Sequence, residues 1–130
     1  MSTLLAKAKL KPGYEDFFEE IAREVFASTH ENESAVVRYE YFRGTDERTY
    51  FVLLSFTDFN GFMAHQVADY HHNVDFMDCF EDFRLQWLDP IDGASPLTQS
   101  ETEGRVDQAK GDIWNQYVQN HSEKTPAWWL

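Results

Sequence analysis

The sequence predicts an α+β fold, an antiparallel sheet of four strands with helices on one face. Three features predict it: strand-like alternation of apolar and polar residues, a helical stripe after the first strand, and a second helical segment before the last strand. The 130 residues suffice for one domain with a hydrophobic core. Hydrophobic residues make up 42% of the chain and aromatic residues 16%, a composition too apolar for a disordered protein.

The first strand is expected at residues 3–10 and the first helix at residues 14–26. Every second position of the strand carries one set of aliphatic side chains, those of Leu4, Ala6, Ala8 and Leu10. In the helix, apolar residues recur every three or four positions, and acidic residues occupy the opposite side. The polar residues 30–34 are expected to end this helix.

Residues 35–43 and 48–56 are expected to form a β-hairpin. Both runs are rich in aromatic and β-branched residues, and the polar segment 44–47 between them supplies a turn. The second run is nearly continuous in apolar residues, which is typical of a strand covered on both faces. One face of the sheet must then be covered by something other than the domain's own helices.

A second helix and a last strand complete the predicted domain. Asp58 is a good N-cap for a helix at residues 59–67. A further short helix is expected to start near His72 and to turn three apolar side chains inward, those of Val74, Met77 and Phe80. Residues 83–88 alternate as a strand, so the order of elements is that of the ferredoxin-like split βαβ fold.

The chain is expected to divide into a ferredoxin-like domain at residues 1–91 and a C-terminal extension at residues 92–130. Residues 92–104 are rich in Gly, Ser, Thr, Pro and acidic side chains, a composition typical of a linker. Beyond it, a short helix is indicated by the apolar residues Val106, Ala109, Ile113 and Tyr117, with Trp114 as a further candidate. We expect the terminal Trp128 and Trp129 to pack on this chain or on a partner.

The charge balance excludes several classes of partner. Eleven basic and 23 acidic side chains give a net charge of −12. Binding to nucleic acid or to an anionic membrane requires a basic protein surface instead. No apolar run approaches the roughly 20 residues of a membrane span, and the first residues lack the apolar stretch of a secretory signal. A single cysteine, Cys79, fits a reducing compartment. We therefore expect a cytoplasmic protein that binds neither nucleic acid nor membrane.

Several fragments occur in a fixed order along residues 3–90. They are a strand ending in Lys11-Pro12-Gly13, the helix at residues 14–26, Val37-Arg38-Tyr39-Glu40-Tyr41, Phe51-Val52-Leu53-Leu54 leading to Asp58, and Phe62-Met63-Ala64-His65 followed by His72. This ordered series resembles the antibiotic biosynthesis monooxygenase family of small α+β barrel proteins.

The resemblance implies a homodimer whose two sheets pack face to face as a dimeric α/β barrel, with a small-molecule pocket between sheet and helices in each subunit. It also implies oxidation of aromatic polyketides or quinols by O2 without a metal or a flavin, so we expect no cofactor. Similar folds isomerise small phosphorylated dicarbonyls, and this alternative stays open. A non-catalytic dimer that binds a small metabolite is the other alternative.

His65 and His72 are the candidate catalytic residues. An imidazole can take a proton from a phenol or an enolisable carbon near neutral pH. We expect His65 to be the base and His72 to assist or orient. A metal site would combine them with His71 and Asp69, but adjacent histidines on a helix point about 100° apart, and we expect no metal.

Aromatic side chains are the candidates for binding a flat, conjugated substrate: Tyr39, Tyr41, Phe56, Phe62 and Trp87. Packing in the core or at a dimer interface is the alternative explanation for the same residues. These observations together predict a cofactor-independent monooxygenase that acts on an aromatic or quinol-type small molecule.

Overall fold

The computed structural model describes residues 1–72 and 76–129, and of His72 it describes the backbone only. The domain predicted at residues 1–91 contains four strands and three helices, and a fourth helix follows in the extension. In chain order they are β1 (Ser2–Leu10), α1 (Glu15–Asn32), β2 (Val36–Arg43), β3 (Thr49–Phe56), α2 (Phe59–Val67), α3 (Asp69–His72), β4 (Phe80–Trp87) and α4 (Asp112–His121).

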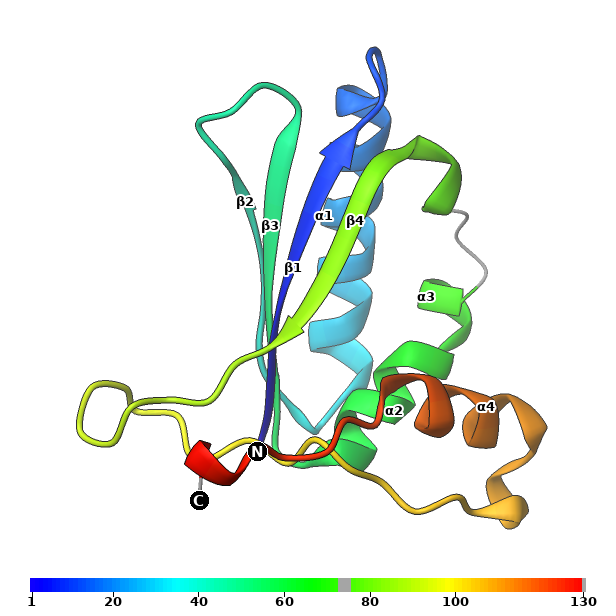
Figure 1. The fold of residues 1–130 in the computed structure, drawn as a ribbon. Coiled ribbons are helices and arrows are strands. Elements are labelled where there is room, and N and C mark those ends of the chain that lie inside the picture. Colours follow the sequence, from blue (N-terminus) through cyan, green and yellow to red (C-terminus); the bar gives the residue numbers. More distant parts are fainter. Residues whose placement is uncertain (73–75, 130) are drawn as a thin grey trace.

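The four strands form one sheet in the order β2-β3-β1-β4, and all neighbours are antiparallel. Figure 1 shows α1 packed along the sheet, with α2, α3 and α4 gathered on the same side. A sheet with this strand order and helices on one face is the ferredoxin-like fold, which confirms the predicted fold class. Among the described residues, no helix combines the length and the apolar character that a membrane span requires.

The two faces of the sheet differ in their environment. Leu4, Ala6 and Ala8 of the central strand β1 face the helices and are at most 3% exposed. Alternation along the neighbouring strand β3 turns Phe51 and Leu53 to the opposite face, where both are only partly buried. The described helices therefore leave an apolar sheet face uncovered, as the continuous apolar run in β3 predicts.

Helix α1 is longer than predicted and extends to Asn32. It ends within the polar segment 30–34, as expected, and the ring of His30 in its last turn packs on Phe26 with centroids 4.2 Å apart. The predicted N-cap of α2 is confirmed, because the carboxylate of Asp58 accepts a hydrogen bond from the backbone N–H of Gly61 at 2.7 Å.

The predicted helix that buries Met77 and Phe80 is wrong. Met77 is 66% exposed, and Phe80 is the first residue of β4. The ring of Phe80 packs on Phe18 and Phe83, an arrangement that an aromatic residue achieves on a pleated strand. Val74, the third residue of that prediction, lies outside the described residues.

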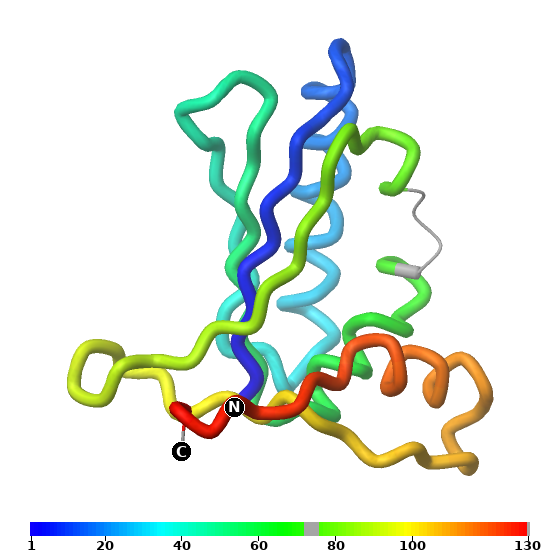
Figure 2. Tube along the Cα trace, viewed as in Figure 1, coloured from blue at the N-terminus to red at the C-terminus, as the bar shows by residue number. Residues whose placement is uncertain are grey.

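The C-terminal extension passes the N-terminal end of β1 before it reaches α4. The Ser2 hydroxyl donates to the carbonyl of Glu101 at 2.7 Å, and the Thr3 N–H donates to the Ser100 hydroxyl at 3.2 Å. Figure 2 shows the chain looping away after β4 and returning beside the N-terminus. Gly104 then passes so close to Phe59 that a Cβ would lie 2.2 Å from its ring, so the path requires glycine.

The inward side of α4 agrees with the sequence at Trp114 and Tyr117, which pack on the core, and differs at Val106 and Ile113, which are exposed. Trp114 and Val118 are buried against the core, whereas Val106 and Ile113 are about half exposed. The reason is that α4 begins only after Gly111, whose φ of +93° places it before the helix. The i, i+4 spacing within α4 then aligns Trp114 with Val118. At the tail, Trp129 packs against the core and Trp128 is 80% exposed.

Candidate functional site

A cavity of about 490 Å³ lies between the sheet and the helices. All four strands contribute to its wall, together with α1, α2, α3 and α4. Ala6 and Ala8 of the central strand supply only methyl groups at its floor, which leaves room that longer side chains would fill. This volume is within the range of small-molecule sites.

The structure places the predicted aromatic residues in two groups. Tyr39, Tyr41 and Trp87 line the cavity. Phe56 and Phe62 do not line it, because both are fully buried in the core, where their rings lie 5.9 Å apart. The first group offers flat surfaces to a ligand, whereas the second supports the fold.

Tyr39 and Tyr41 form a hydroxyl pair on the wall, with their oxygens 2.6 Å apart. Burial raises the pKa of Tyr39 well above its ordinary value and raises the pKa of Tyr41 to about 12. Both phenols therefore keep their protons at neutral pH. Because one proton occupies the bond between them, the accepting hydroxyl keeps its own proton for another acceptor, such as an oxygen of a bound ligand.

His65 is fully buried and does not line the cavity. Its Nδ1 lies 2.9 Å from the carboxylate of Glu33, which follows the end of α1. The hydroxyl of Tyr70 donates to the same oxygen of Glu33. A carboxylate only accepts, so the proton of neutral His65 is on Nδ1 and the lone pair is on Nε2. Among the described residues, Nε2 has no hydrogen-bond partner.

Two imidazoles line the cavity, that of His71 from α3 and that of His121 from α4; His71 is the one in contact with His65. Its ring lies 4.5 Å from that of His65, which also packs on Tyr39 at 4.6 Å. His65 thus sits behind two residues that reach the cavity. The side chain of His72, the other predicted catalytic residue, lies outside the described part of the structure.

Sequence reasoning missed Glu33 and Tyr70, and it considered His71 only as a metal ligand. The available signal was weak: Glu33 is one of several acidic residues in the bend after α1, and the chain separates it from His65 by 32 positions. The described residues contain no group of three histidine, cysteine or acidic side chains able to hold a metal ion.

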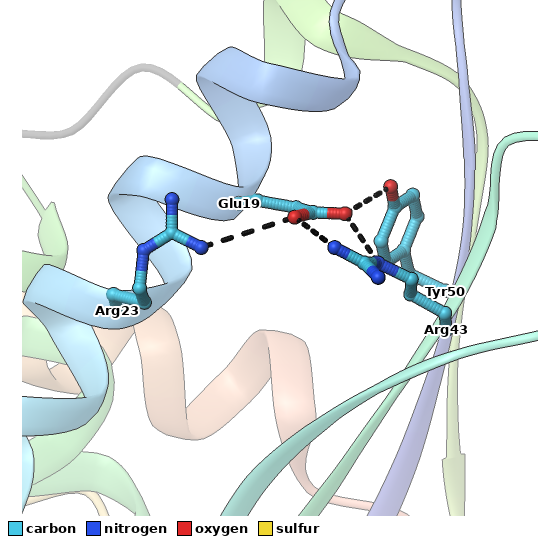
Figure 3. Close-up of polar contacts among 4 residues, drawn as sticks. All are labelled: Glu19, Arg23, Arg43 and Tyr50. Atoms are coloured by element: carbon cyan, nitrogen blue, oxygen red, sulfur yellow. Dashed lines mark hydrogen bonds and ion pairs between the residues drawn. The ribbon is translucent and has the colours of Figure 1, made fainter.

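A second polar cluster joins α1 to the sheet outside the main cavity (Figure 3). Glu19 accepts hydrogen bonds from Arg43 Nε at 2.6 Å and from the Tyr50 hydroxyl at 2.9 Å, and Arg23 lies 3.8 Å away. The hydrogen bonds from Arg43, followed by the one from Tyr50, lower the pKa of Glu19 to about 2. This cluster holds the first half of α1 against β2 and β3.

Residues 1–74, more than half of the chain, match the family described as antibiotic biosynthesis monooxygenase. The chain belongs to the antibiotic biosynthesis monooxygenase family. No curated protein matches it significantly.

Solved structures with the same fold agree with membership of the antibiotic biosynthesis monooxygenase family. A candidate antibiotic biosynthesis monooxygenase from Caulobacter crescentus has a TM-score of 0.65 at 21% identity, covering 70% of this chain and 90% of its own. One from Nitrosomonas europaea has a TM-score of 0.64 at 13% identity, and the match covers 70% of this chain and 99% of that protein. A Mycobacterium tuberculosis protein has a TM-score of 0.65 at 13% identity, covering 72% and 98%. These relatives are almost fully matched, so this chain carries additional length.

Proposed function

We propose that this member of the family is a cofactor-independent monooxygenase that oxidises an aromatic or quinol-type small molecule with O2. The observation that carries the proposal is a cavity lined by aromatic residues, with a protonated tyrosine pair and the imidazole of His71 on its wall. Trp87 and the two tyrosines offer aromatic surfaces to flat conjugated rings, which favour stacked or edge-on contacts.

The base in this proposal is His71, because its ring lines the cavity. His65, the base that the sequence suggested, becomes a positioning residue: Glu33 holds its ring, and that ring packs against His71. The Tyr39–Tyr41 pair donates a hydrogen bond to the oxygen that becomes negative on the substrate. An assisting role for His72 stays a prediction.

The proposed reaction balances with substrate and O2 alone. His71 removes a proton from a ring carbon acidified by a neighbouring carbonyl or phenol. The carbanion gives its electron pair to O2 and forms a C–O bond, and protonation yields a hydroperoxide. Loss of water then leaves a carbonyl on that carbon, so one oxygen atom enters the product and the other enters water. The substrate supplies all the electrons.

A homodimer is part of the same proposal. The partly buried Leu5, Phe51 and Leu53 lie on the sheet face opposite the described helices, next to the exposed Phe42 on β2. An apolar face of this kind is costly in water, and a second copy covers it when two sheets pack face to face. This arrangement leaves the cavity of each subunit on the helical side.

Oxygen uptake by metal-stripped protein with anthrones and quinols tests the proposed function. We expect one O2 consumed per carbonyl formed and a loss of about 100-fold in kcat for His71→Ala, a typical contribution of a general base. His30→Ala is the matched control, because His30 is an exposed histidine on α1 that does not line the cavity.

The outcomes separate the alternatives. Unchanged turnover in His71→Ala removes His71 from the mechanism. Ligand binding without oxygen uptake indicates a metabolite-binding protein, and product formation under anaerobic conditions indicates an isomerase. Among the described residues, the cavity wall carries no lysine or arginine, and this disfavours an anionic dicarbonyl substrate.

A further inference from the structure

We propose that α4 forms a selective wall of the cavity, at which Gln66 and His121 recognise an oxygen substituent on the ligand's ring system. The aromatic class of the ligand rests on the proposed function. Its binding by Gln66 and His121 does not require oxidation and can be measured separately. The wall comes from the C-terminal extension: the family match ends at residue 74, and the solved relatives cover about 70% of this chain, the length of residues 1–91.

Hydrogen bonds fix the orientation of both side chains. His121 Nδ1 lies 2.9 Å from the carbonyl oxygen of Tyr117, and because a carbonyl only accepts, Nδ1 carries the proton of neutral His121. The lone pair of Nε2 then accepts from the amide nitrogen of Gln66 at 3.2 Å. The amide of Gln66 is thereby assigned, with its nitrogen toward α4.

This arrangement leaves Gln66 with unused hydrogen-bonding capacity at the cavity. Gln66 is 8% exposed and lines the cavity, as does His121. An amide nitrogen has two protons, and the described residues account for one of them. The second N–H and the carbonyl oxygen of Gln66 can therefore pair with a hydroxyl or carbonyl group of a ligand.

The rest of the wall suits an aromatic ligand. The rings of Tyr117 and His121 stack almost parallel, at an interplanar angle of 4° and a centroid separation of 5.4 Å. His121 also packs edge-on against Phe62 at 5.6 Å, so the core holds this stack in place. The cavity wall thus carries two hydrogen-bonded pairs, Tyr39–Tyr41 from β2 and Gln66–His121 from α2 and α4, in addition to the polar residues His71, Asn120 and Glu123. A ring system with oxygen substituents at two separate positions matches both.

Anaerobic calorimetry with 2,7-dihydroxyanthrone, whose hydroxyl groups are distant from the ring carbonyl, and with unsubstituted anthrone tests this inference without turnover. The two probes differ only in hydroxyl groups remote from the reacting carbon. We expect the wild-type protein to bind the dihydroxy probe about tenfold more tightly, the value of one net hydrogen bond. Gln66→Leu should abolish that preference and leave the affinity for anthrone within about threefold of wild type.

Two further variants keep the test decisive. His121→Phe retains the ring packing on Tyr117 and Phe62 but removes the acceptor that orients Gln66, so we expect the same loss of preference with an unchanged melting temperature. Gln116→Leu, an exposed residue of α4 that does not line the cavity, is the control and should keep the preference.

An equal loss of affinity for both probes in Gln66→Leu or His121→Phe would overturn the inference, because it indicates a structural wall only. Failure of the wild type to bind or to discriminate the probes overturns it as well. Discrimination without oxygen uptake in air contradicts the proposed oxidation, yet it supports recognition by Gln66 and His121.

Discussion

The carboxylate of Glu33 accepts a hydrogen bond from Nδ1 of His65 over 2.9 Å, and this joins the end of α1 to the last turn of α2. Tyr70 donates to the same carboxylate oxygen from α3. One acidic side chain therefore fixes the relative position of three helices beneath the cavity. His65 itself is completely buried, so its polar ring depends on this partner.

Glu33→Ala should destabilise the fold by about 2 kcal/mol, because it leaves the buried N–H of His65 and the hydroxyl of Tyr70 without their acceptor. The free energy of unfolding in urea measures the effect. Glu31→Ala removes an exposed acidic residue from the last turn of the same helix and should change stability by less than about 0.5 kcal/mol. Equal stability of the two variants would contradict the structural role of Glu33.

Tyr41 should make stability depend on alkaline pH. An unfolded tyrosine ionises near pH 10, whereas burial raises the pKa of folded Tyr41 to about 12. The unfolded chain therefore loses its proton first, and the free energy of unfolding falls as the pH rises from 10 to 12. Tyr41→Phe should show a shallower decline over this range, by up to about 2 kcal/mol.

Urea unfolding at a series of pH values measures this difference between the two proteins. Tyr14→Phe is the control, since Tyr14 is 37% exposed and lies outside the cavity wall. A decline in Tyr41→Phe as steep as that of the wild type would show that Tyr41 ionises normally in the fold.

Glu19 should contribute stability that acid removes. Its pKa is about 2 in the folded protein, chiefly because Arg43 donates hydrogen bonds to it, and 4.5 is the ordinary value. The contribution is therefore complete above pH 4.5 and is lost as the pH falls from 4.5 to 2. Because water screens this partly exposed cluster, we expect a loss of only about 1 kcal/mol.

In Glu19→Gln the free energy of unfolding should accordingly vary less over this acid range. Glu20→Gln removes an exposed neighbour on α1 and should retain the wild-type slope. The prediction fails if the two variants have the same pH dependence.

Ala6→Leu should block the cavity. The new side chain extends from the floor into open volume, so we expect ligand affinity to fall at least about tenfold while stability changes by less than about 1.5 kcal/mol. Ala64→Leu adds the same atoms at an exposed position of α2 and should bind normally. Retained affinity in Ala6→Leu would place the ligand elsewhere.

Leu53→Glu should produce monomers if two sheets pack face to face, because it buries an unpaired charge at the interface. Light scattering at micromolar concentration measures the mass. Val106→Glu alters an exposed apolar residue of the extension and should remain dimeric. A wild-type protein that is monomeric under these conditions contradicts the proposed dimer.

Local patterns were sufficient for most of the domain. The period-two spacing of Leu4, Ala6, Ala8 and Leu10 identified β1 and its buried face, and Asp58 identified the start of α2. The errors arose where a short apolar run fits both the helical period of 3.6 residues and the strand period of two residues. Met77 and Phe80 have helical spacing, yet Phe80 begins strand β4 and packs on Phe18 from there.

The site was less predictable because it is made by contacts between distant residues. The sequence indicated His65 but not its acceptor, since any of several acidic side chains could have reached it. Gln66 and His121 are 55 positions apart, and their contact depends on where the extension returns to the domain. The local periodicity of apolar residues does not predict where the C-terminal extension contacts the domain.

The hydrogen bonds between residues 2–3 and residues 100–101 also constrain the order of folding during synthesis. The strand made first by the ribosome is completed by a segment made some hundred residues later. Until residues 100–101 have been synthesised, the Ser2 hydroxyl and the Thr3 N–H lack these acceptors, although β3 already pairs with this end of β1. The N-terminal edge of the domain is therefore completed only late in synthesis.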